Sequence, residues 1–452
     1  MAMKITLEFP VLRNEEDHTD NKQNQEIVAE TQIDALPYAI LADILTRVPA
    51  KTVFLCKTLA KPWLSVIDCP QFAREHFSRS KMCPLLVFTD PLGRKTNRIF
   101  HLVEAQTVSD FNPMKLNSRI EFPDVMRGPS SFLRNVNTNV ISCEGMLCWG
   151  TRRGAGDIVI ANPITGEYAT LNHHPERGQE VTSTFVGLGF NRVTRTYELL
   201  RMTLGSVDDP DCPIAWLSEI CTVGTKLWRR CGASSLRLSF TRKISDVIYV
   251  NGSLYWIYKS DTTICRFCFD NASFRVVLLD EIDDLMTSAD SFLIGSLGVL
   301  DNSLCVSFIS QYDGHVELWT LTTTNVVGCQ GTWRRVHIVE TLTTRYEHSG
   351  RLWSRGEYRV IRYLDDGKIL LHDWRATFLL YDPVTENEGF FRLLEHSNIE
   401  GLRSLLHLQV VPHVPSLVSL KDTLNIQEDN VEVWKTYNSR IKILNASRQH
   451  VQ

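Results

Sequence analysis

Cys265 and Cys268 form the one C-x-x-C pair of this chain, and this spacing could hold a metal ion. A zinc site would need a second pair of ligands nearby. The pair lies in a run typical of a β-strand, where residues three apart face opposite sides of a sheet. His173 and His174 precede a proline in a polar stretch, which indicates solvated loop histidines. We therefore expect no metal and no other cofactor.

Patterns typical of catalysis are also missing. The chain contains no G-x-S-x-G nucleophile elbow, no P-loop and no H-E-x-x-H motif. Gly187-Leu188-Gly189 is too short for a dinucleotide-binding loop, and glycines in a strand are typical of close packing. The sequence therefore favours a protein that binds over one that catalyses.

Charge and hydrophobicity restrict the class of partner. The chain has 452 residues and a formal net charge of -4. This balance gives no basic field for a nucleic acid, and no apolar run is long enough to span a membrane. The first residues lack the apolar core of a secretory signal. The twelve cysteines are therefore expected to be reduced, in a protein of the cytoplasm or nucleus that is not secreted.

Between residues 34 and 80, apolar residues recur at steps of three and four, the spacing that places them along one face of a helix. Leu36-Pro37 opens the segment, and Pro49 ends the first helix. A second apolar series runs from Val53 to Ile67. Three short helices of this length cannot bury so much apolar surface among themselves, so we expect them to need a partner.

This segment resembles the F-box of plant F-box proteins. The motifs that match are Leu36-Pro37, the run from Ile44 to Lys51, the pair Lys61 and Trp63, and Cys-Pro-x-Phe at residues 69–72. Pro62 departs from the family pattern. Because proline favours the start of a helix over its interior, it predicts a break just before Trp63.

The resemblance implies a three-helix F-box that docks on a Skp adaptor, which in turn holds a cullin scaffold. A small helical unit with an unburied apolar face fits this mode of binding. The residues expected to bind the adaptor are Leu36, Pro37, Ile40, Ile44, Leu45, Val48, Pro49, Leu55, Leu59 and Trp63.

Residues 81–420 read as short β-rich runs separated by turn residues. A turn followed by a strand recurs at Glu144–Trp149, Asn251–Trp256, Asp301–Val306 and Asp366–Leu371. The later copies recur at roughly fifty to sixty residues. This period predicts the four-stranded blades of a β-propeller. We expect six to seven blades, the seventh formed if residues 405–411 pair with residues 84–88. A pair of β-sandwiches is the alternative.

The same region resembles the F-box-associated domain that follows the F-box in plant proteins. The matching stretches include the turn Asn162–Glu167, the run Gly187–Phe190 and the run Thr225–Arg229. The fold class expected for the whole chain is thus mainly β with a small N-terminal α unit. Residues 1–33 are expected to form a disordered acidic leader, and residues 421–452 a polar tail.

Recognition by a propeller takes place on its faces, through the loops that join strands. Residues 343–359 form the loop richest in arginine and aromatic side chains, which protein interfaces favour. The candidate target-binding residues there are Arg345, Tyr346, Arg351, Trp353 and Arg355.

The resemblance implies the substrate-recognition subunit of a ubiquitin ligase of the SCF (Skp–cullin–F-box) type. Such a chain performs no bond chemistry and acts by holding a target near the ligase. Three alternatives stay open: a propeller that binds a small molecule or sugar, an enzyme of the kelch-propeller type, and a scaffold that works outside a ligase.

Overall fold

The computed structural model of this chain describes twenty stretches of residues. They are residues 36–59, 61–80, 85–89, 97–103, 119–123, 140–150, 158–171, 183–206, 214–225, 227–231, 244–258, 263–277, 279, 292–310, 315–322, 331–339, 359–364, 366–372, 377–392 and 409–421. All structural statements below concern these residues.

The N-terminal part consists of four helices, each of which begins at or beside a proline. They are α1 (Tyr38–Thr46), α2 (Ala50–Cys56), α3 (Lys61–Ile67) and α4 (Pro70–Ser80). Proline suits these positions because the first turn of a helix leaves its N–H groups unpaired. The prediction of three helices is wrong, because Cys69-Pro70 starts a fourth. The break expected just before Trp63 lies earlier, since α3 begins at Lys61 and takes Pro62 into its first turn.

The strands that follow these helices form six four-stranded antiparallel sheets among the described residues. Sheet 1 contains β24 (Gln409–His413), β1 (Leu85–Thr89), β2 (Asn97–Val103) and β3 (Arg119–Pro123). Sheet 2 contains β4 (Ile141–Cys143), β5 (Met146–Gly150), β6 (Ile158–Asn162) and β7 (Glu167–Leu171), and sheet 3 contains β8 (Ser183–Asn191), β9 (Thr196–Ser206), β10 (Ile214–Thr222) and β11 (Trp228–Arg230).

The other three sheets follow the chain in order. Sheet 4 contains β12 (Ile244–Val250), β13 (Ser253–Tyr258), β14 (Thr263–Cys268) and β15 (Ser273–Val277). Sheet 5 contains β16 (Phe292–Leu300), β17 (Ser303–Ser310), β18 (Val316–Thr322) and β19 (Thr332–Val339), and sheet 6 contains β20 (Arg359–Tyr363), β21 (Ile369–His372), β22 (Thr377–Asp382) and β23 (Asn387–Arg392).

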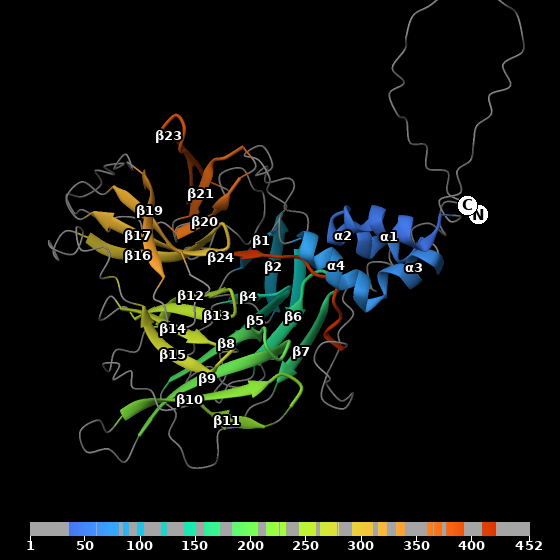
Figure 1. The fold of residues 1–452 in the computed structure, drawn as a ribbon, viewed down its shortest axis with the longest axis horizontal. Helices are drawn as coiled ribbons and strands as arrows, with labels where there is room; N and C mark the ends of the chain where they lie inside the picture. The colour runs from blue at the N-terminus through green and yellow to red at the C-terminus, as the bar shows by residue number, and fades with distance from the viewer. Residues whose placement is uncertain are drawn as a thin grey trace, which may run out of the picture.

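Each sheet contacts the next through its first strand in the sheet order. These strands follow one another as β24, β4, β8, β12, β16 and β20, and β20 contacts β24 to close the ring. Figure 1 shows the sheets arranged around this ring, with the four helices on one side. The chain is therefore a β-propeller, and the alternative of two β-sandwiches is wrong.

Tight turns build the first hairpin of three sheets. Glu144-Gly145, Asn251-Gly252 and Asp301-Asn302 each place two consecutive residues at positive φ. This is the geometry of the two-residue turn that best joins antiparallel strands, and glycine, asparagine and aspartate adopt it most easily. The turn residues quoted from the sequence therefore do set the hairpins.

Sheet 1 joins the two ends of the propeller. β24 pairs with β1 from Leu85↔His413 to Thr89↔Gln409. The side chain of Gln409 accepts a hydrogen bond from the N–H of Val140 (2.9 Å) and donates one to its carbonyl oxygen (3.0 Å). The expected pairing of the chain ends is thus found, but it supplies the fourth strand of sheet 1 and does not add a seventh sheet.

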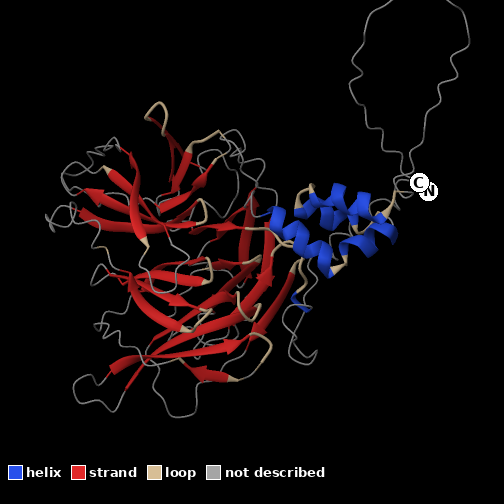
Figure 2. Cartoon of the chain, in the orientation of Figure 1, coloured by secondary structure: helices blue, strands red, loops and turns tan. Residues whose placement is uncertain are grey.

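The helices share one hydrophobic core with sheet 2. Leu41, Leu45 and Phe72 of the helices lie in the same buried cluster as Trp149 and Ile164 of that sheet and its turn. Figure 2 shows the helices grouped against the strands on one side of the molecule. The helical part is therefore packed on the propeller and is not a separate module on a linker.

A segment that follows β24 strengthens this junction. Residues 414–420, named the strap here, place Leu417 in the core shared with the helices. Asn162 donates hydrogen bonds to the carbonyl oxygens of Ser416 and Val418 (2.9 Å each), and Glu167 accepts one from the N–H of Leu420 (2.7 Å). The strap is thus held both by apolar burial and by buried polar contacts.

Candidate functional site

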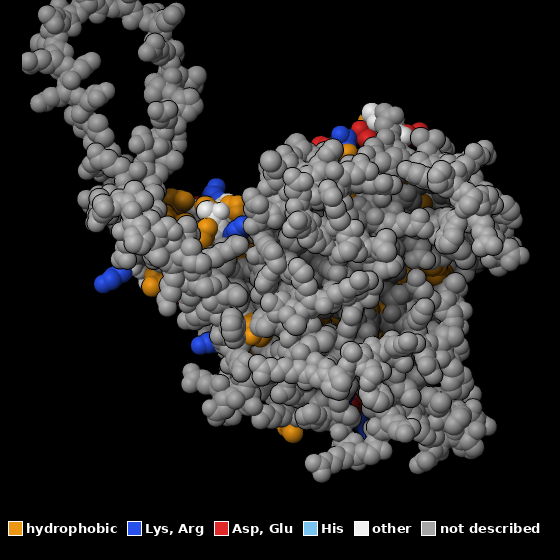
Figure 3. Space-filling model, turned by 180° about the vertical axis from the view of Figure 1, so that it is seen from behind, with side chains coloured by type: hydrophobic (Ala, Val, Ile, Leu, Met, Phe, Trp, Pro, Cys, Tyr) orange, Lys and Arg blue, Asp and Glu red, His pale blue; other side chains and the backbone are white. Residues whose placement is uncertain are grey.

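The helical part carries a surface of exposed apolar side chains, which we name the helical apolar surface. Its members are the large hydrophobic side chains of α1, of α2 and the turn after it, and of α3 that are at least 40 % exposed. They are Tyr38, Ile40, Ile44, Leu55, Leu59 and Leu64. Hydrophobic side chains are visible on the helical side of the molecule in Figure 3. Exposed apolar side chains on neighbouring helices are typical of a surface that binds a partner.

Helix α1 divides its apolar residues between two directions. Leu41 and Leu45 are buried in the shared core, whereas Ile40 and Ile44 are exposed. Because each residue turns the helix by about 100°, two adjacent i, i+4 pairs form two separate stripes. One stripe holds the helix on the protein, and the other remains open to a partner.

The predicted adaptor-binding residues fall into three groups by exposure. Those exposed are Pro37, Ile40, Ile44, Pro49, Leu55 and Leu59, those half-buried are Leu36, Val48 and Trp63, and Leu45 is buried. Trp63 and Val48 pack against the shared core, so they support the surface from below. Tyr38 and Leu64 were not among the predicted residues, although each lies next to one of them, Pro37 and Trp63.

Helix α4 fixes the position of α1 and α2. The Nε2 atom of His76, which is buried, lies 2.8 Å from the carbonyl oxygen of Val48. Burial lowers the pKa of His76, so its ring is neutral at pH 7. Arg79 donates to the Thr46 hydroxyl (2.7 Å) and pairs with Asp43 (3.2 Å). These contacts hold the helices in one arrangement before any partner binds.

Charged groups border the helical apolar surface. Arg47 pairs with Asp43 across one helical turn (2.8 Å), and the hydrogen bond from Arg47 lowers the pKa of Asp43. Lys57 pairs with Asp68 at 2.6 Å and lies over the ring of Phe54. Three of these four side chains are at least 48 % exposed, so the pairs contribute little to stability. They surround the apolar side chains with polar ones.

Tyr38 and Cys69 form a polar contact at the edge of the surface. Their hydrogen bond raises the pKa of the Tyr38 hydroxyl. The backbone N–H of Phe72, followed by the Tyr38 hydroxyl, lowers the pKa of the Cys69 thiol. The contact joins the start of α1 to the start of α4.

Other predicted positions contribute no site among the described residues. The loop candidates Arg345, Tyr346, Arg351, Trp353 and Arg355 lie outside the described residues. Cys265 and Cys268 both lie in β14 and are buried, with Cys265 in the core between sheets 3 and 4. Where the structure describes side chains, it places no three His, Cys, Asp or Glu residues as metal ligands. The described helices include none that could cross a membrane.

The model of the F-box associated beta propeller domain matches residues 100–420. This match covers most of the chain and all the sheets except part of sheet 1. The chain belongs to the family of F-box proteins with this propeller domain. The result confirms the family that the sequence motifs indicated.

Curated relatives are also named as F-box proteins. F-box protein CPR1 of Arabidopsis thaliana is 24 % identical over 364 residues, which cover 75 % of this chain and 82 % of that protein. F-box protein At5g10340 of the same plant is 23 % identical over 378 residues, which cover 78 % and 79 %. Among solved structures, a chain of a nidogen/laminin complex is 14 % identical with a TM-score of 0.39, covering 73 % of this chain and 98 % of that one.

Proposed function

We propose that this F-box protein is the substrate-recognition subunit of an SCF-type ubiquitin ligase. In this proposal residues 34–80 form the F-box, and the helical apolar surface docks on a Skp adaptor that holds a cullin. The propeller binds the target protein, and the chain itself catalyses no reaction. The work would take place in the cytoplasm or nucleus.

The observation that carries this proposal is the exposed apolar stripe on α1. Ile40 and Ile44 lie in the stretch that carries the F-box motifs, and both are exposed. The chain belongs to a family of F-box proteins, so an open apolar stripe at this place supports adaptor binding. Burying the six side chains of the helical apolar surface against a partner would remove a large apolar area from water, which favours binding. Polar residues around them would form the rim of the interface.

The core that the helices share with sheet 2 fixes the position of the F-box relative to the propeller. A target on the propeller and an adaptor on the helices would be held at a fixed distance, because the helices and sheet 2 pack as one unit. A fixed arrangement raises the local concentration of the target near the ligase more than a flexible linker would.

The test is a pull-down of the intact chain with a purified Skp adaptor, comparing the wild type with the double variant Ile40→Asp/Ile44→Asp. We expect the wild type to bind and the variant to lose at least about 100-fold in affinity, because two charges would enter an apolar interface. Both positions are exposed, so the variant should keep its fold. Val384→Asp, at an exposed aliphatic residue of sheet 6, is the matched control.

Failure of the folded wild type to bind any Skp adaptor would contradict the adaptor role. Unchanged binding by the double variant would place the adaptor elsewhere on the chain. Thermal unfolding of all three proteins shows whether they are folded.

A further inference from the structure

Three turns of the propeller have the same construction. They start at Asn162, Asn191 and Asp382, the last residues of β6, β8 and β22. The side-chain oxygen of each accepts hydrogen bonds from the N–H groups two and three residues later, at 2.9 to 3.4 Å. The fifth residue of each turn has a positive φ, between 55° and 71°. The third residue is an aliphatic one in all three, at Ile164, Val193 and Val384.

These three aliphatic residues differ in what covers them. Ile164 is only 3 % exposed, because it lies in the core that the four helices share with sheet 2. Val193 is 75 % exposed and Val384 is 89 % exposed. The same turn therefore places an aliphatic side chain in a core shared with the helices at one position in this chain and in solvent at two others.

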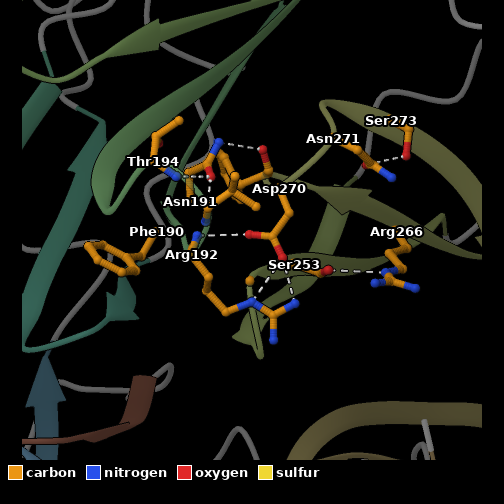
Figure 4. Close-up of polar contacts among 12 residues, drawn as sticks. Phe190, Asn191, Arg192, Thr194, Ser253, Arg266, Asp270, Asn271 and Ser273 are labelled. Atoms are coloured by element: carbon orange, nitrogen blue, oxygen red, sulfur yellow. Dashed lines mark hydrogen bonds and ion pairs between the residues drawn. The ribbon is translucent and has the colours of Figure 1, made fainter. Parts of the chain in front are cut away.

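The turn that carries Val193 is rigidly attached to sheet 4 (Figure 4). The amide of Asn191 donates to the carbonyl oxygen of Phe269 (2.9 Å), and the backbone N–H of Arg192 donates to Asp270 (2.8 Å). The guanidinium of Arg192 donates two further hydrogen bonds to Asp270, at 2.8 and 2.5 Å. An exposed aliphatic side chain on a pre-ordered turn can bind with little loss of conformational entropy.

A second exposed side chain lies at the same end of sheet 3. Leu227 precedes β11 in the turn after β10, and it is 81 % exposed. Turns after β8 and after β10 lie at the same end of an antiparallel sheet, and they are joined because the N–H of Val223 donates to the carbonyl oxygen of Tyr197 (2.9 Å). Adjacent strands are about 4.8 Å apart, so Val193 and Leu227 can enter one interface.

The charge exposed around these side chains is positive. Arg192 and Arg229 are 55 % and 58 % exposed at their side chains, whereas their carboxylate partners Asp270 and Glu198 are 17 % and 4 % exposed. Arg195 is exposed as well. The carboxylates lie below and the guanidinium groups face solvent, so an approaching protein meets arginines around two aliphatic residues.

We propose that the arginine-bordered turns of sheet 3, formed by Arg192, Val193, Arg195, Leu227 and Arg229, dock a helical partner protein with an acidic border around an apolar socket. Ile164 is buried in a core to which this chain's own helices contribute, which indicates a helical socket, and the exposed arginines indicate the acidic border. These turns would be the surface that holds a target, so the inference rests on the proposed function.

The probe is a synthetic twenty-residue amphipathic helical peptide, with leucines along one face and glutamates beside them. Its fluorescence anisotropy is titrated with the full chain, without any adaptor, so that this test and the adaptor pull-down can fail separately. A second peptide carries lysine in place of every glutamate. The variants are Val193→Asp/Leu227→Asp and the matched control Val384→Asp, which changes the equivalent exposed residue of sheet 6.

We expect the acidic peptide to bind the wild type and Val384→Asp equally, and to bind the double variant at least about tenfold more weakly. Binding should weaken as salt rises, because charges contribute to it. Lack of saturable binding, equal binding of the lysine peptide, or an unchanged affinity of the double variant would each overturn the proposal. All the altered residues are exposed, and thermal unfolding verifies that each variant is folded.

Discussion

A chain that ends at residue 408 should not fold cooperatively. The deletion removes β24, which pairs with β1 over five residues and whose Gln409 binds the backbone of Val140. It also removes the strap, and with it Leu417 from the core shared by the helices and sheet 2. The ring of sheets would be open, and the inner edge of β1 would lose the strand that satisfies its backbone hydrogen bonds.

The measurement is urea unfolding followed by circular dichroism, and the matched control is a chain that ends at Lys421. The control retains β24 and the strap, so we expect its transition midpoint to equal that of the full chain. The shorter chain should show no cooperative transition and should elute as an aggregate from a sizing column. A cooperative transition in the shorter chain would show that sheet 1 closes without its C-terminal strand.

The free energy of unfolding should fall steeply as pH decreases from 7.5 to 5. Burial lowers the pKa of His413 and of His372 from 6.5 to about 3, and nearby Arg359 also lowers that of His372. The Nε2 atoms of both have no hydrogen-bond partner. Each histidine is therefore held neutral in the folded state, because burial and the missing partner at Nε2 disfavour a charge on its ring.

The direction follows from the two states. Above pH 6.5 both histidines are neutral whether the chain is folded or unfolded, and their contribution is fully present. Below pH 6.5 these two histidines become protonated in the unfolded chain, whereas in the folded chain they stay neutral down to about pH 3. At pH 5 this costs about 2 kcal/mol for each histidine, or about 4 kcal/mol for both.

Urea unfolding at a series of pH values checks this prediction. His413→Gln should reduce the loss at pH 5 by about 2 kcal/mol relative to the wild type, because one buried imidazole is removed. A free energy of unfolding that stays constant between pH 7.5 and 5 would contradict the account of these two residues.

The hairpins of the propeller could be predicted from the sequence because local chemistry determines them. Glu144-Gly145 and Asn251-Gly252 are turn pairs wherever they occur between apolar runs. The number of sheets depends on long-range pairing. The sequence indicated that β1 meets the C-terminal strand, but it did not show that this strand completes sheet 1.

The helical part was predicted in outline and missed in detail for similar reasons. Helix α4 has a proline start signal at Pro70 but few of the apolar repeats used to find the others. The spacing of Ile40, Leu41, Ile44 and Leu45 indicates apolar positions on a helix, yet it cannot say which pair faces the propeller. That choice depends on sheet 2 and the strap, which are distant in the sequence.

The turn surface of sheet 3 could not be found from the sequence alone. Asn162 and Asn191 start similar runs of residues, so the repeated turn is visible in the sequence once the structure points to it. Whether its aliphatic residue is covered depends on where the helices pack. Ile164 and Val193 are chemically alike, and their difference in exposure arises only in the folded chain.

The most direct test of the central claim is hydrogen exchange of the intact chain with and without a purified Skp adaptor. We expect protection to rise in α1, α2 and the start of α3, across Pro37–Leu64, while the sheets are unchanged. The shared core keeps the propeller in place, so no other segment should respond. Protection confined to the propeller, or none in the helices at saturating adaptor, would contradict the account.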